Sequence, residues 1–176
     1  MCTQSDERIH EAEAVEPSPA EALGERVRAF LRGELMLADL CELTREELYI
    51  LAEQGRRLYQ EGLLDEARRV FGALTVLEPG EGYFLSCLGL VHQQQGELDG
   101  ARRAYDQAIE LDETDVPSRC NRAEVLLQLG HLEAASEDLK RIAELDPEGN
   151  LEHSQRARGM ALALGMLVHR SLEEAG

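Results

Sequence analysis

The sequence has no tryptophan and only three phenylalanines and four tyrosines among 176 residues. Basic residues are also few: Lys and Arg total 18 against 35 Asp and Glu, so the formal net charge is −17. A surface this acidic argues against nucleic acid and anionic membranes as partners, because both are themselves negatively charged. The charge suits solubility or a basic protein partner. The shortage of aromatic residues is compatible with a helical array in which Leu and Ala form the core.

Motifs for metal binding or catalysis are also missing. Cys2, Cys41, Cys87 and Cys120 form no CxxC pair and have no histidine at zinc-site spacing, so we expect reduced thiols. There is no glycine-rich phosphate loop, no GxSxG and no HExxH. We therefore predict a protein that is not an enzyme and that holds no metal and no cofactor.

Sequence signals for secretion or membrane insertion are also missing. The first residues are polar and acidic and contain no apolar signal-peptide core. The longest apolar run, Met160 to Val168, includes Gly165 and is too short to cross a bilayer. We expect a cytoplasmic protein without membrane insertion.

The sequence does contain one pattern of residues that occurs three times between Leu48 and Pro147, at an interval of 34 residues. The repeated residues are a glycine (Gly62, Gly96, Gly130), an alanine (Ala67, Ala101, Ala135) and a large apolar residue (Phe71, Tyr105, Leu139). This period and these recurring residue types are the signature of a tetratricopeptide repeat, a pair of antiparallel helices. The glycine favours the turn after the first helix, and the alanine allows the two helices to cross closely. We predict an all-α fold: a right-handed superhelical array of three repeats with flanking N- and C-terminal helices.

Composition and capping signals divide the chain into four predicted segments. Residues 1–17 are acidic and poor in apolar residues, which predicts a disordered tail. Residues 18–43 form a helical segment with its own apolar stripe, which could either cap the array or make a dimer contact. A capping box at Thr44 opens the repeats, which fill residues 44–147. Residues 148–176 are expected to form a helix that covers the last repeat.

The first helix of each repeat is expected to line the concave inner face of the array. The second, fifth, ninth and twelfth positions, counted from Leu48, should face that groove. The predicted peptide-binding residues are Ala52, Arg56, Tyr59, Tyr83, Ser86, Leu90, Gln93, Cys120, Glu124 and Leu127, and Tyr49 and Pro117 occupy the remaining two positions. Tyr and Leu suit shallow apolar contacts and Gln, Ser and Arg suit bonds to a peptide backbone. The alternative is that neighbouring helices partly cover Tyr83 and Leu90.

A carboxylate clamp of Lys, Asn and Arg, which other repeat proteins use to hold chaperone C-termini, is not found at these positions. Among the matching residues, only Asn121 and Arg56 could serve.

Several stretches resemble the class II chaperones of type III secretion systems, which hold translocator proteins before export. They are residues 58–62, 67–74, 76–79, 83–89 and 123–130. The resemblance implies a cytosolic chaperone that cradles an extended segment of an export substrate, and it implies possible homodimerisation through the N-terminal region. By position it implies peptide contacts for Tyr59, Tyr83, Ser86, Leu90 and Cys120. A general repeat adaptor or scaffold in a bacterial multiprotein assembly is the alternative, and an enzyme or metal protein is the third hypothesis.

Overall fold

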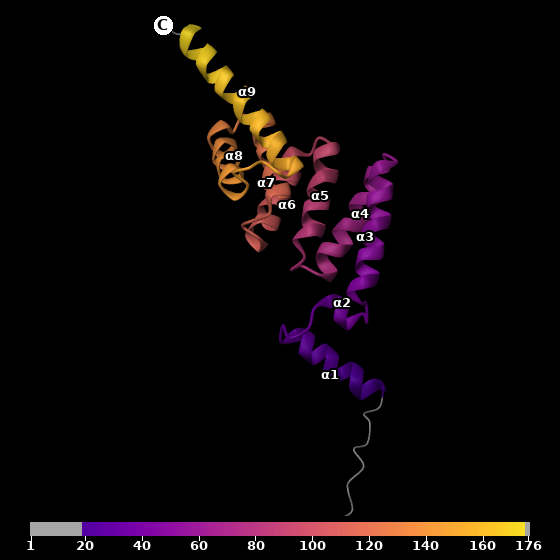
Figure 1. Ribbon diagram of the computed structural model, residues 1–176. Coiled ribbons are helices and arrows are strands. Elements are labelled where there is room, and N and C mark those ends of the chain that lie inside the picture. The colour runs from indigo at the N-terminus through magenta and orange to yellow at the C-terminus, as the bar shows by residue number, and fades with distance from the viewer. Residues whose placement is uncertain (1–18, 175–176) are drawn as a thin grey trace, which may run out of the picture. The chain divides into compact units, whose positions relative to one another are not determined.

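The computed structural model describes residues 19–174, and within this range every regular element is a helix. The all-α prediction is therefore confirmed for the part of the chain that the structure describes. The predicted acidic tail, residues 1–17, lies outside the described residues. The helices are α1 (Pro19–Leu31), α2 (Leu37–Leu40), α3 (Arg45–Gln60), α4 (Leu64–Leu77), α5 (Gly82–Gln94), α6 (Leu98–Leu111), α7 (Val116–Gln128), α8 (Leu132–Leu145) and α9 (Glu152–Glu174) (Figure 1).

The chain divides after Leu35 into two compact units. The first unit contains α1, an amphipathic helix whose apolar stripe is exposed: Leu23 is 53% accessible, Val27 38% and Leu31 76%. The division falls inside the segment predicted as residues 18–43. The remainder of that segment belongs to the second unit, where Ala38 is buried and Leu43 packs against the same core cluster.

The second unit begins its first repeat with the predicted capping box. The Thr44 hydroxyl accepts a hydrogen bond from the Glu47 amide at 3.2 Å, and the Thr44 amide donates to the Glu47 carboxylate at 2.8 Å. These bonds satisfy two backbone donors at the start of α3 that have no partner within the helix. The bonds to Thr44 also hold the pKa of Glu47 below its usual value.

Each repeat is a pair of helices with the turn and the close crossing that the repeat pattern predicts. Gly62, Gly96 and Gly130 end the turns after the first helices with φ between +77° and +79°, a conformation that side chains disfavour. Ala67, Ala101 and Ala135 are fully buried where the two helices cross. The predicted register of the repeats is therefore confirmed at both the turn and the crossing.

The first helices also contain small residues at 34-residue spacing: Gly55, Gly89, Ala123 and Ala157. Gly55 faces the ring of Phe71 and Gly89 faces the ring of Tyr105. The third repeat has the bulkier Ala123 together with the smaller Leu139, so the total volume at the crossing is roughly conserved. Ala157 shows that α9 continues the register as the first helix of a further repeat.

Each first helix touches the next one along the chain: α3 contacts α5, α5 contacts α7, and α7 contacts α9. Among the described helices, the second helices α4, α6 and α8 make no such contacts with each other. Because the first helices contact one another and the second helices do not, the stack bends toward the row of first helices. We call the surface formed there by the second, fifth, ninth and twelfth positions of α3, α5 and α7 the first-helix face.

Candidate peptide-binding face

The ten residues predicted to bind a peptide all lie on α3, α5 and α7, three helices that stand in one row. Arg56 is exposed, and Tyr59, Ser86, Leu90, Gln93, Glu124 and Leu127 are half-buried. Tyr83 is 39% exposed. Neighbouring helices thus cover part of Tyr83 and Leu90 but leave a portion of each accessible.

Two of the predicted residues are not accessible. Ala52 is 1% exposed and belongs to the core cluster that contains Leu48, Phe71 and Phe84. Cys120 is fully buried because α9 packs over it, and its thiol donates a hydrogen bond to the carbonyl of His153 at 3.2 Å. The prediction that Ala52 and Cys120 contact a peptide directly is therefore corrected, because both side chains belong to the core.

The end of the first-helix face nearest the N-terminus is aromatic. Tyr49 and Tyr83 stack with ring centroids 5.8 Å apart and planes only 9° from parallel. Phe84 tilts against both rings, at 5.5 Å and 5.9 Å. Burial raises the pKa of Tyr83 to about 12, so its hydroxyl stays protonated at neutral pH. The three rings form a rigid apolar shelf, because aromatic side chains have few rotamers to lose.

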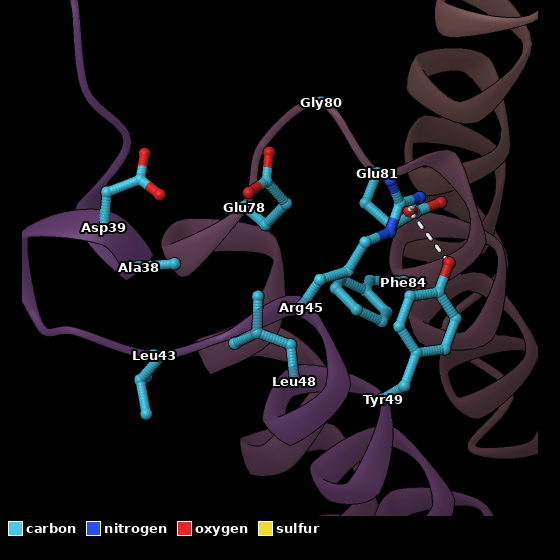
Figure 2. A pocket seen from close by; sticks show the side chains of 10 residues that line it. All are labelled: Ala38, Asp39, Leu43, Arg45, Leu48, Tyr49, Glu78, Gly80, Glu81 and Phe84. Carbon is cyan, nitrogen blue, oxygen red and sulfur yellow. Dashed lines mark hydrogen bonds and ion pairs between the residues drawn. The ribbon is translucent and has the colours of Figure 1, made fainter.

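A small cavity of about 210 Å³ adjoins this shelf (Figure 2). Its key residues are joined by polar contacts: the Tyr49 hydroxyl donates to the Glu81 carboxylate at 2.9 Å, and Arg45 pairs with the same carboxylate at 2.7 Å. The Arg45 guanidinium also lies 5.7 Å from the centroid of the Tyr49 ring. The cavity is lined by Ala38, Asp39, Leu43, Arg45, Leu48, Tyr49, Glu78, Gly80, Glu81 and Phe84. Sequence reasoning missed Glu81 because it lies in the connection between two repeats.

The middle of the face combines polar and apolar groups. Arg56 forms an ion pair with Glu53 on its own helix, at 3.0 Å. Gln93 accepts a hydrogen bond from the Tyr105 hydroxyl at 3.0 Å, which fixes the amide at the edge of the face. Half-buried Leu90 lies one helical turn before Gln93. An extended chain could thus meet an apolar side chain and an oriented amide in close succession.

The end nearest α9 carries a group that sequence reasoning missed. Arg156 of α9 donates from Nε to the Cys120 sulfur at 3.3 Å and from its terminal nitrogen to the Asn121 side-chain oxygen. The same guanidinium lies 4.0 Å from the Glu124 carboxylate. The signal that could have found it is the spacing of Ala157, which places α9 in line with the first helices.

The described residues contain no group of three or more His, Cys, Asp or Glu side chains arranged to hold a metal ion. Cys41, Cys87 and Cys120 are free thiols. Burial raises the pKa of Cys87 to about 11, which keeps this thiol protonated and poorly nucleophilic at neutral pH. In the stretch that the structure covers, none of the helices is both long and apolar enough to cross a membrane.

Comparisons with known proteins agree with this architecture. Two family models match, one described as TPR repeat over residues 89–130 and one as Tetratricopeptide repeat over residues 116–148. The Low calcium response locus protein H of Yersinia pestis is 32% identical over 113 residues, which cover 64% of this chain and 67% of that protein. The structure of the Yersinia enterocolitica type III secretion translocator chaperone SycD matches with a TM-score of 0.68 and 32% identity, over 73% of this chain and 98% of SycD. The chain belongs to the family of type III secretion translocator chaperones.

SycD has also been solved in complex with a peptide of the translocator YopD, and this structure matches with a TM-score of 0.64 at 31% identity, over 70% of the present chain and 95% of SycD. A further structure of SycD contains an alternative dimer. The resemblance to translocator chaperones inferred from the repeats is confirmed. Which residues of this chain contact a ligand stays a prediction.

Proposed function

We propose that the chain is a cytoplasmic, non-enzymatic chaperone that holds an extended segment of a secreted translocator along its first-helix face. The observation that carries this proposal is the row of accessible apolar and amide side chains on the inner side of the bend, from Tyr83 to Leu127. The peptide complex of the related SycD supports the same kind of ligand. The proposed contact residues are Arg56, Tyr59, Tyr83, Ser86, Leu90, Gln93, Glu124 and Leu127.

The chemistry of the face fits an extended chain better than a small molecule. The Tyr49–Tyr83 shelf and Leu90 offer separate apolar contacts along the row, so alternate side chains of a peptide could reach them. Beside these contacts, Ser86, Gln93 and Arg56 can bond the peptide backbone, which would otherwise lose its hydrogen bonds to water. The ordered, partly buried rings reduce the entropy that binding costs.

The experiment is affinity purification of the tagged chain from its native cell, followed by mass spectrometry, for the wild type and three variants. Tyr83→Glu and Leu90→Glu place a charge on the first-helix face. Val76→Glu is the matched control, because Val76 is 61% exposed on α4, a second helix. Thermal unfolding of all four proteins shows whether the fold is intact.

We expect a single secreted translocator to co-purify with the wild type and with Val76→Glu, and to be lost from both variants of the face. Equal recovery by all four proteins would refute the assignment of the face. Several soluble partners that are indifferent to the variants would support the adaptor alternative and direct attention to the second helices.

A further inference from the structure

Arg156 reaches the end of the first-helix face from outside the three repeats. It lies on α9, and its guanidinium contacts Cys120 and Asn121 on α7. Its side chain remains 45% exposed, and that of the neighbouring Glu124 is 39% exposed. A cation is therefore accessible beside the residues proposed to bind a peptide.

The hydrogen bonds of this guanidinium hold it in place, and neither of them is to a carboxylate. Both hydrogen-bond acceptors, the Cys120 sulfur and the Asn121 amide oxygen, are neutral. Burial raises the pKa of the Cys120 thiol, which keeps the sulfur uncharged. The carboxylate of Glu124 forms a long ion pair with it at 4.0 Å, beyond hydrogen-bond distance, so the guanidinium keeps N–H donors for a further partner. Arg122, by contrast, is bonded directly to a carboxylate, that of Asp138, at 2.6 Å.

An oriented guanidinium with spare donors is suited to a carboxylate. Arg carries five N–H donors in a planar fork, and a carboxylate can accept two of them in parallel. The site is also partly shielded from water, because Asn121 is only 4% exposed and Cys120 is fully buried. Partial shielding strengthens a charge-assisted bond relative to one in open solvent.

We infer that Arg156 binds a carboxylate of the protein segment held on the first-helix face, at the end of the face nearest α9. This inference rests on the proposed function and specifies its ligand. The carboxylate is either the side chain of an Asp or Glu within an otherwise apolar segment or the free C-terminus of the bound chain. Arg156 sets specificity, and the apolar contacts on α5 supply the rest of the affinity.

The test uses fluorescein-labelled synthetic peptides selected on the full-length wild-type chain from a library of short apolar sequences with randomised Asp, Glu, Asn and Gln. Each selected peptide is then made with its acid replaced by the matching amide, and with a free or an amidated C-terminus. Affinities are measured by fluorescence anisotropy for the wild type, Arg156→Gln, Arg156→Lys and Arg69→Gln. Arg69 is the matched control, because it is 70% exposed on α4 and its loss changes the net charge equally.

We expect the wild type and Arg69→Gln to bind the acidic form about tenfold more tightly than the amide form, the size of one charge-assisted hydrogen bond. Arg156→Gln should bind both forms almost equally, while Arg156→Lys keeps part of the preference. In the wild type, the preference for the acidic over the amide form is a readout that does not depend on how any variant folds.

The control arms separate the possible results. A preference that follows the C-terminal group alone supports the inference with the terminal carboxylate as ligand. Binding of apolar peptides with no preference for acid over amide overturns the inference and leaves the proposed function standing. Failure of every library peptide to bind overturns the proposed function and the inference with it.

Discussion

Gly89 lies directly against the ring of Tyr105: a Cβ atom added to Gly89 would be 2.6 Å from Cε1 of that ring. Tyr105 is fully buried and its hydroxyl is bonded to Gln93, so the ring has little freedom to move away. This contact sets how closely α5 and α6 approach in the second repeat. It explains why the first helix has a glycine there even though glycine disfavours helices.

Gly89→Ala should therefore destabilise the protein by about 1–3 kcal/mol, the cost of overpacking a core. The matched control is Gly72→Ala on α4, where an added Cβ meets no atom within 4 Å. That change should be neutral or stabilise by up to about 1 kcal/mol, because alanine is the better helix former. Urea unfolding measures both values.

A double variant sharpens this test. Gly89→Ala combined with Tyr105→Leu recreates the pair that the third repeat has in Ala123 and Leu139. We expect the double variant to lose less stability than the two single variants together, since the smaller side chain makes room for the Cβ. Additive losses would mean that the contact between Gly89 and Tyr105 does not limit packing.

The same contact shows what the sequence could and could not predict. The repeats were predictable because identical residue types recur every 34 positions, and the turn glycines and the crossing alanines lie where that period places them. A period says which side of a helix a residue is on, but not what covers it. Ala52 and Cys120 have the register of the face, yet the core and α9 enclose them.

Two other features, Arg156 and the Tyr49–Tyr83 stack, were harder to predict for a different reason. Arg156 lies at the end of the face only because α9 continues the stacking, and only Ala157 indicated this in the sequence. The Tyr49–Tyr83 stack depends on side-chain rotamers of two helices, which no single-helix pattern contains.

Asp138 provides a second prediction, since its side chain is only 3% exposed and accepts bonds from both Arg119 and Arg122. Asp138→Ala would leave two partly buried guanidinium groups without this acceptor, and we expect a loss of about 3–5 kcal/mol. Asp106→Ala is the control, because Asp106 is 31% exposed and pairs with the same Arg122. It should cost about 1 kcal/mol or less. Equal losses in denaturant unfolding would contradict the central role given to Asp138.

The exposed stripe of α1 leads to a third prediction, on oligomeric state. Leu23 and Leu31 lie on one side of this helix and are largely accessible, which favours a contact with a second copy. We expect light scattering to find a dimer for the wild type and a monomer for Leu23→Asp combined with Leu31→Asp. Leu162→Asp is the control, because Leu162 is 67% exposed on α9. A monomeric wild type would refute the dimer contact.

Asp146 gives a fourth prediction, on pH dependence, at the junction between the repeats and α9. Its carboxylate accepts hydrogen bonds from the backbone amides of Leu151 at 2.9 Å, Asn150 at 3.1 Å and Gly149 at 3.0 Å. These bonds favour the charged form, with the amide of Leu151 the largest contributor, and lower the pKa of Asp146 from 3.8 to about 2. Because the pKa is lower in the folded state, the carboxylate stabilises the fold above about pH 4. This contribution is lost as the pH falls toward 2.

The measurement compares the unfolding temperature of the wild type and Asp146→Asn across this pH range. The amide keeps the shape of the side chain but not its charge, so the variant should unfold at a lower temperature near neutral pH. The difference should shrink between about pH 4 and pH 2, as the wild-type carboxylate becomes protonated. Equal unfolding temperatures for the two proteins at every pH would show that shape, and not charge, holds the junction. In that case, α9 would be fixed in place mainly by its packing on α7 and α8 and by the bonds of Arg158 to the carbonyls of Pro147 and Glu148.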